Sequence, residues 1–189
     1  MKLHKIVVAS SNEGKIAEIK SIFTDVEIVS MHELGFTDEI EETGKSFKEN
    51  AKLKAETIAK KFSLPALSDD SGLCVEALHG APGIYSARFS GEGPAENRKL
   101  LLKRMEHVYD RRAYFESAVC LCFPDGKTYF GQGKTYGRIL YEEIGTNGFG
   151  YDSLFFSDDL KKSFGLATDG EKNGVSHRFR ALADLRSKL

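Results

Sequence analysis

The sequence of 189 residues predicts an α/β fold, with strands and helices alternating along the chain. Two short apolar runs, 5–9 and 26–30, flank a segment with helical spacing of its apolar residues, 13–23. A later segment, 113–123, is apolar on both faces, which is the pattern of a central strand that is covered on both sides. The length indicates a single domain, with room for two lobes.

The composition is that of a globular protein without a strongly charged surface. Hydrophobic residues make up 41% of the chain and charged residues 29%, which are ordinary fractions. The 27 basic and 28 acidic side chains give a net charge of −1, so we expect neither a nucleic acid nor a membrane as partner. Any site for an anion must be built from local groups.

The apolar runs and the cysteines favour a cytoplasmic protein. The N-terminal apolar run, 6–9, is too short for the core of a signal peptide, and the longest run, 118–123, has only the length of a strand. Cys120 and Cys122 lie two residues apart on one predicted strand, where they are poorly placed to form a disulfide. We therefore expect the three cysteines to be free core thiols in a reducing compartment.

The first predicted helix, 13–23, carries Ile16, Ile19 and Phe23 at helical spacing. The turn that joins it to the strand at 5–9 reads SSNEGK, which is a series of small polar residues followed by a lysine. This turn contains too little glycine for a P-loop. Taken alone, it is either an ordinary turn or one wall of a site.

The longest helical pattern covers about residues 45–62 and follows an irregular acidic segment at 36–44. Its apolar stripe consists of Phe47, Ala51, Ala55, Ile58, Ala59 and Phe62. Asn50 and Lys54 lie one turn apart at the edge of this stripe. They could face a cleft, or the lysine could simply extend along the core toward solvent.

The middle of the chain contains a strand, a long loop and a helix. The segment 65–72, PALSDDSG, reads as a short strand that runs into two aspartates, and the apolar segment 73–78 follows it. The stretch 79–93 is rich in glycine and proline and has no clear period, which predicts an ordered functional loop or a linker. The segment 94–108 predicts a helix with Pro94 near its start.

The C-terminal part continues with a hairpin, a loop and a last helix. A turn signal at 124–126 separates the central strand from a second strand at 127–140. A glycine-rich loop then enters a short strand within 145–156, and 176–189 predicts the closing helix. The tripeptide GKT at 133–135 is no P-loop, because the required glycine five residues before Gly133 is replaced by Thr128.

Two carboxylate pairs are candidates for a metal site. Glu41 and Glu42 come just before the long helix, and Asp69 and Asp70 end a predicted strand. Carboxylates of this kind could hold Mg²⁺ and orient or deprotonate a water molecule. Alternatively, the glutamates could favour the helix start electrostatically, and the aspartates could belong to a turn.

Two further clusters could bind a ligand. Lys172, His177 and Arg178 precede or occupy the start of the last helix, after Ser176 as a plausible cap. Positive groups there oppose the helix dipole, so they either serve a ligand or form a surface cluster. The segment 148–152, GFGYD, could offer aromatic rings for stacking on a base, although core aromatics are commoner.

Five stretches, in this order, resemble the inosine triphosphate pyrophosphatase family. They are ASSNEGKIAEI (9–19), EETGKSFKENAKLKA (41–55), ALSDDSGLCVEALHGAPGIYSARFSG (66–91), GFGYDSLFF (148–156) and EKNGVSHRFRAL (171–182). They span nearly the whole chain, and the third and fifth are the most specific.

The resemblance implies a fold, a reaction and partners. It implies one domain over 1–189 with a long twisted mixed sheet flanked by helices, and two lobes with an active-site cleft between them. The reaction would be hydrolysis of ITP, dITP and XTP to the monophosphate and pyrophosphate, which clears deaminated purines from the nucleotide pool. The family needs Mg²⁺ and forms homodimers.

The resemblance also implies roles for individual residues. The phosphate-binding turn would be Ser10, Ser11, Asn12, Glu13, Gly14 and Lys15. Glu42 and Asp70 would be metal ligands, with Asp70 also the general base, while Lys54 would face the phosphates and Ser71 the substrate. The base would be surrounded by Phe149, Gly150, Tyr151, Asp152, Lys172, His177 and Arg178.

Two small departures from the family pattern leave the chemistry intact. Ser10 stands where threonine is common, and Ser153 replaces a frequent proline.

Arg178 can only donate hydrogen bonds, so it suits the O6 atom of a 6-keto purine and disfavours the amino group of adenine. The alternatives are a nucleotide sensor without catalysis and a phosphatase that releases the terminal phosphate.

Overall fold

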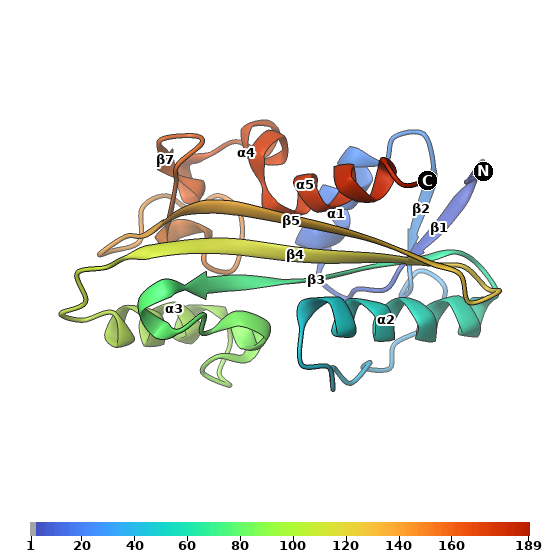
Figure 1. The fold of residues 1–189 in the computed structure, drawn as a ribbon, viewed down its shortest axis with the longest axis horizontal. Helices are drawn as coiled ribbons and strands as arrows, with labels where there is room; N and C mark the ends of the chain where they lie inside the picture. Colours follow the sequence, from blue (N-terminus) through green and yellow to red (C-terminus); the bar gives the residue numbers. More distant parts are fainter. Residues whose placement is uncertain (1–2) are drawn as a thin grey trace. The chain divides into compact units, whose positions relative to one another are not determined.

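The structure is a computed structural model that describes residues 3–189, and it confirms the predicted α/β class (Figure 1). Within this range, seven strands are hydrogen-bonded in the order β2-β1-β3-β4-β5-β6-β7. β1 is parallel to β2 and β3, and β6 is antiparallel to β5 and β7, so the sheet is mixed, as expected. The strands are β1 Lys5–Val8, β2 Glu27–Ser30, β3 Ala66–Val75, β4 Arg112–Cys122, β5 Thr128–Ile139, β6 Phe155–Ser157 and β7 Lys162–Ser163. The helices are α1 Glu13–Ile22, α2 Phe47–Phe62, α3 Pro94–Arg104, α4 Asp169–Val175 and α5 His177–Arg186.

The chain divides into two compact units. Unit 1 consists of the residues up to Asp70, Ser117–Gly133 and Arg178–Leu189. Unit 2 consists of Ser71–Glu116 and Lys134–His177. The boundaries fall inside β3, β4 and β5, so each of these long strands contributes residues to both units.

Unit 1 has three layers, with α2 on one face of its strands and α1 and α5 on the other (Figure 1). Ile6 and Val8 of β1 pack with α1 and α5, whereas Val7 and Ala9 pack with α2. Successive residues of a strand point to opposite faces, so a strand covered on both sides must be apolar throughout. This explains the uninterrupted apolar run at the start of the sequence.

β3 is longer than the sequence predicted, and the interpretation of DDSG as a turn is wrong. The strand runs without a break from Ala66 to Val75, and it is buried throughout except at the half-buried Ser71. Asp69 and Asp70 therefore lie inside a strand and not at its end. Buried polar groups are tolerated where they have partners, and both aspartates have several.

Unit 2 has a core of its own, built around aromatic side chains. The ring of Phe115 lies 4.8 Å from that of Phe155 and 6.2 Å from that of Phe164. Leu101 and Met105 pack in the same cluster. The stretch 79–93 is an ordered loop, because the Ser86 hydroxyl accepts a hydrogen bond from the Leu73 N–H at 2.9 Å. The stretch also contains a short 3-10 helix, Gly83–Arg88, so it is ordered, as one of the two alternatives predicted, and its functional role stays a prediction.

The helices differ from the prediction at their ends. α3 stops at Arg104, earlier than predicted, and His107 then adopts a positive φ of 61°. A helix that the sequence analysis missed, α4, begins after Thr168, which forms a capping box with Glu171. The glycines within α4 concealed its pattern, and Lys172 lies on this helix. α5 covers most of the predicted closing helix.

The cysteines are free and buried, as predicted. Cys120 and Cys122 lie in the core cluster that faces α2, as expected for residues two apart on one strand. Within residues 3–189, no helix combines the length and the apolar character needed to cross a membrane.

Candidate active site

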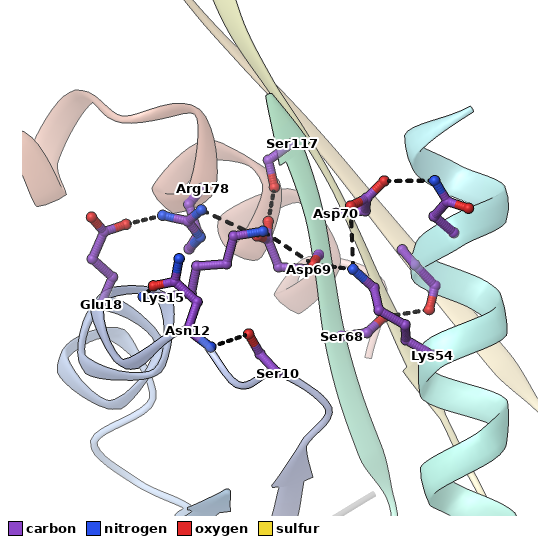
Figure 2. A network of polar contacts seen from close by, with 12 residues as sticks. Ser10, Asn12, Lys15, Glu18, Lys54, Ser68, Asp69, Asp70, Ser117 and Arg178 are labelled. Carbon is purple, nitrogen blue, oxygen red and sulfur yellow. Dashed lines mark hydrogen bonds and ion pairs between the residues drawn. The ribbon is translucent and has the colours of Figure 1, made fainter. Parts of the chain in front are cut away.

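The turn between β1 and α1 folds as the sequence predicted, with Asn12 at the start of the helix (Figure 2). The Asn12 side-chain oxygen accepts a hydrogen bond from the Lys15 N–H at 3.1 Å, and the Asn12 N–H donates to Ser10 Oγ at 3.1 Å. Ser11 and Glu13 are exposed and Gly14 is half-buried. The start of a helix with exposed N–H groups is suited to binding an anion.

Asp69 and Asp70 point to opposite faces of β3, because neighbouring residues of a strand alternate. Leu67 packs in the core cluster on the side of α1 and α5, and Asp69 contacts residues of these same helices. Ser68 bonds to the Ala51 carbonyl of α2, and Asp70 contacts two further side chains of this helix. One strand thus supplies a carboxylate to each face (Figure 2).

On the face of α1 and α5, Asp69 is surrounded by donors. Its Oδ2 atom lies 2.8 Å from Lys15 Nζ and 3.1 Å from Arg178 Nη2, and its Oδ1 atom accepts a hydrogen bond from Ser117. Burial alone would raise the pKa of Asp69, but Arg178 and Lys15 hold this pKa well below its usual range. Asp69 is therefore an ionised, fully engaged carboxylate. Burial also lowers the pKa of Lys15, although Asp69 opposes that shift.

On the face of α2, Asp70 is close to a second lysine. Lys54 Nζ lies 3.2 Å from Asp70 Oδ1 and 2.7 Å from Glu42 Oε1. Asn50 Nδ2 donates to Asp70 Oδ2 at 3.2 Å. Burial raises the pKa of Asp70, although the charge of Lys54 opposes this shift. For Lys54, burial would lower the pKa, but the charges of Asp70 and Glu42 outweigh burial and raise it. A carboxylate with a raised pKa is a suitable proton acceptor near neutral pH.

The two lysines converge on one atom. Lys54 Nζ donates to the Asp69 carbonyl oxygen at 3.1 Å, and Lys15 Nζ lies 3.5 Å from the same oxygen. Lys15 comes from α1 and Lys54 from α2, so helices on opposite faces of the strand bring their ammonium groups together. Two ammonium groups that converge in this way are suited to a ligand with several negative charges.

The oxygen atoms around Lys54 also suit a hard cation. Glu42 Oε1, Asp70 Oδ1 and the Asp69 carbonyl oxygen all lie within 3.2 Å of Lys54 Nζ. Mg²⁺ prefers oxygen ligands and commonly takes one or two protein carboxylates, with water and phosphate oxygens as the remaining ligands. Within the described residues, no group of three or more His, Cys, Asp or Glu side chains is arranged to hold a metal ion. Glu42 and Asp70 are therefore the two carboxylates that would contribute to a magnesium site, and its remaining ligands would come from water and a phosphate group.

A second group of predicted residues lies in unit 2, around Asp152. Lys172 Nζ lies 2.7 Å from Asp152 Oδ2 and 4.6 Å from the centre of the Phe149 ring. The Phe149 N–H donates to Asp152 Oδ2 at 2.8 Å. The loop at 148–152 and helix α4 therefore form one structured cluster. A flat ring beside a paired lysine is a surface on which a base can stack.

Tyr151 does not fit the interpretation of this segment as a pair of stacking aromatics. Tyr151 is only 5% exposed and packs in the core of unit 2, and its hydroxyl donates to the Ser86 carbonyl at 2.8 Å. Phe149, the other aromatic residue of this segment, is half-buried and so keeps part of its surface accessible. The other predicted residues nearby also have structural contacts: the His177 ring stacks on Phe115 at 4.9 Å, and the Gly150 carbonyl accepts from Arg98 at 3.1 Å. Ser71 is half-buried on β3.

Arg178 belongs to unit 1 and is paired there with two carboxylates. Its side chain is 1% exposed, and its guanidinium contacts Glu18 of α1 and Asp69 of β3 (Figure 2). Burial would lower the pKa of Arg178, but Asp69 and Glu18 outweigh it and raise this pKa further above its usual range. Arg178 is therefore a permanently charged donor whose two terminal nitrogens contact Glu18 and Asp69, and its role at O6 stays a prediction.

The chain matches the model of the Ham1 family over residues 6–188. It belongs to the Ham1 family. The chain is 42% identical to the dITP/XTP pyrophosphatase of Bacillus licheniformis, over 99% of this chain and 98% of that one. It is 43% identical to the dITP/XTP pyrophosphatase of Haemophilus influenzae, over 98% of both chains. The solved structure of the Staphylococcus aureus Ham1 protein superposes with a TM-score of 0.87, at 40% identity and over 97% of both chains. The predicted resemblance is confirmed.

For this Ham1-family chain, sequence reasoning left three contacts of the site unassigned. Glu18 lies three residues after Lys15, so one face of α1 carries both, and this spacing was a signal that could have been used. Asn50 was placed at the edge of the helix stripe, but its bond to Asp70 was not foreseen. Ser117 gave no signal, because its bond to Asp69 depends on how distant strands lie in space.

Proposed function

We propose that the chain hydrolyses deaminated purine nucleoside triphosphates, namely ITP, dITP and XTP, to the monophosphate and pyrophosphate. The observation that carries this proposal is the convergence of Lys15 and Lys54 on the Asp69 carbonyl, next to two carboxylates. The names of its Ham1-family relatives, dITP/XTP pyrophosphatases, support the reaction and the substrates.

In this proposal, the residues of unit 1 bind the phosphates and the metal. The turn from Ser10 to Lys15 and the Lys54 ammonium meet the negative charges of the triphosphate. Glu42 and Asp70 hold Mg²⁺, which, when bound, neutralises phosphate charge. The donor set of oxygen atoms around Lys54 supports this assignment.

Asp70 acts as the general base in the proposed reaction. It accepts a proton from the attacking water, and Asn50 and Lys54 keep its carboxylate oriented. Hydrolysis of a phosphoanhydride depends mainly on positioning and charge stabilisation, so no covalent nucleophile is needed. The cysteines of the chain are free and buried, which is consistent with this.

The base is read by donors. In this proposal Phe149 stacks on the ring of the base, Arg178 donates to O6, and the remaining contacts come from Ser71, Gly150, Asp152, Lys172 and His177, whereas Tyr151 serves the core. Adenine would place an amino group against this donor, and a mismatched buried pair of donors is unfavourable by about 1–3 kcal/mol.

We also propose that the chain acts as a single domain over 1–189, in the cytoplasm, as a homodimer.

The proposed reaction is tested by incubating the protein with ITP and Mg²⁺ and analysing the products. We expect IMP and pyrophosphate, with ATP a much poorer substrate. Release of IDP and orthophosphate would instead identify a phosphatase acting at the terminal phosphate. Binding of ITP without any product would identify a nucleotide sensor.

Asp70→Asn tests the general base. We expect kcat for ITP to fall by about 100-fold or more, because the amide cannot accept the proton, while the far-UV circular dichroism spectrum stays that of the wild type. Glu41→Gln removes a nearby exposed carboxylate and serves as the control, with turnover unchanged. Wild-type turnover by Asp70→Asn would contradict the role of Asp70.

A further inference from the structure

Four charged side chains of unit 1 form a continuous chain of contacts, Lys15–Asp69–Arg178–Glu18, here called the charge chain (Figure 2). Lys15 and Glu18 come from α1, Asp69 from β3 and Arg178 from the first turn of α5. Because the two ends of the charge chain lie on the same helix, three elements are linked through four side chains.

Asp69 holds both cations of the charge chain with a single atom. Lys15 Nζ lies 2.8 Å and Arg178 Nη2 3.1 Å from the same oxygen, Oδ2. The other oxygen, Oδ1, accepts the hydrogen bond from Ser117 of β4. With both oxygens engaged, the Asp69 carboxylate cannot rotate without losing a charged partner, so the positions of the lysine and the arginine depend on each other.

Glu18 holds the other side of the arginine. It contacts Arg178 Nη1, whereas Asp69 contacts Nη2. The side chains of Asp69, Arg178 and Glu18 are 0%, 1% and 12% exposed, so water competes little for these contacts. The two acidic and two basic groups balance in charge, and removal of one would leave a buried charge without its partner.

We propose that Asp69 and Glu18 are positioning residues of the active site, and that they differ in which side chains they position. Asp69 sets the positions of both Lys15 and Arg178, and Glu18 sets the position of Arg178 alone. This inference rests on the proposed function, in which Lys15 meets the phosphates and Arg178 reads O6 of the base. Glu18 then affects only the choice of base, whereas Asp69 affects both the choice of base and the binding of phosphate.

The test compares Glu18→Gln and Asp69→Asn in two measurements. The first is the ratio of kcat/KM for ITP to that for ATP, and the second is the inhibition constant of inorganic triphosphate, which has no base. We expect Glu18→Gln to lower the ratio by about ten-fold and to leave the inhibition constant within about two-fold of the wild type. Asp69→Asn lowers the ratio and also raises the inhibition constant by about ten-fold.

The matched control is Asp25→Asn. Asp25 follows α1 and contacts Arg186 of α5 at 2.9 Å, so this variant also removes a carboxylate that links α1 and α5, but an exposed one outside the charge chain. We expect both measurements to match the wild type. Thermal unfolding of each variant shows whether it folds, and Glu18→Gln, at the more exposed end of the charge chain, carries the test if Asp69→Asn does not fold.

Two results would overturn the inference. If Glu18→Gln or Asp69→Asn only loses thermal stability, with both measurements at wild-type values, the charge chain is structural. If Glu18→Gln raises the inhibition constant as much as it lowers the ratio, Asp69 and Glu18 do not differ in which side chains they position. A wild-type protein that does not cleave ITP refutes the proposed function instead, and calorimetric binding of ITP, ATP and inorganic triphosphate to the same variants then tests the charge chain.

Discussion

The Lys15 side chain is largely buried, and its ammonium group is held there by a buried carboxylate. It follows three residues after the cap of α1, and its ammonium reaches back to β3, where it contacts the Asp69 side chain and lies near the Asp69 carbonyl. Such a cation, partly desolvated and next to a second lysine, binds a polyanion more strongly than a lysine on an open surface.

We therefore predict that Lys15→Ala raises KM for ITP by about ten-fold or more, because a charge-assisted contact to phosphate is lost. Steady-state kinetics measures the change. Lys20→Ala, on the same helix, removes an exposed lysine that forms an ion pair with Glu33 at 3.7 Å, and it should behave as the wild type. If Lys15→Ala kept both KM and kcat, the turn would have no role in phosphate binding.

Glu42 and Glu41 form a natural pair for testing the metal. Glu42 contacts Lys54 beside Asp70, whereas the neighbouring Glu41 is exposed. We predict that Glu42→Gln raises the Mg²⁺ concentration needed for half-maximal activity by about ten-fold, since a neutral amide is a poorer ligand than a carboxylate, and that Glu41→Gln does not. A magnesium titration of the three proteins decides, and equal midpoints would exclude Glu42 as a ligand.

At the scale of elements, the contact between β5 and α5 requires a residue without a side chain. A Cβ atom on Gly131 would lie 2.0 Å from the Ala181 carbonyl oxygen and 2.8 Å from Leu185 Cβ. The backbone of α5 therefore approaches the strand directly, and this close contact helps to fix the helix that carries Arg178 in its first turn.

We predict that Gly131→Ala lowers the free energy of unfolding by about 1–3 kcal/mol, because α5 must move away from β5. Urea unfolding followed by circular dichroism is the appropriate measurement, since the chain has no tryptophan. Gly170→Ala in α4 is the control: nothing lies within 4 Å of its Cβ position, so stability should stay the same or rise by up to about 1 kcal/mol. Equal stability of Gly131→Ala and the wild type would refute the close packing.

At the scale of the whole molecule, the net charge is only −1. The pH dependence of stability is instead expected to depend on the buried thiols. Burial raises the pKa of Cys74 to about 11 and that of Cys120 to about 12. The native protein thus holds these protons more tightly than the unfolded chain, in which a thiol has a pKa of about 8.5. The contribution to stability is complete below that value and is lost as the pH rises toward 11–12.

We predict that the free energy of unfolding falls between about pH 9 and pH 11, and that Cys120→Ala makes this decline shallower whatever its stability at pH 7. Urea midpoints at several pH values give both slopes. The comparison of slopes is needed because lysines and tyrosines also titrate in this range. Identical slopes would show that Cys120 is accessible to solvent in the native state.

The sequence by itself determined much of the fold and named the residues of the candidate site. Apolar periodicity placed α1, α2 and the central strand β4, because burial of an apolar face imposes a period of 3.6 or 2 on the chain. Pro94 marked the start of α3, where it is the first helical residue. The five family segments named Lys15, Lys54 and Asp70, because their residue types and order are specific.

The tertiary structure alone decided which charges meet. The aspartates of DDSG look like a turn in the sequence, but buried partners on both faces allow β3 to continue, and the strand then sends Asp69 to one face and Asp70 to the other. Glu18 and Arg178 are 160 residues apart in the chain, so no local pattern could pair them. Local periodicity reports which side of an element is buried, whereas partners for a buried charge are chosen by the packing of distant elements, and this is decided only in three dimensions.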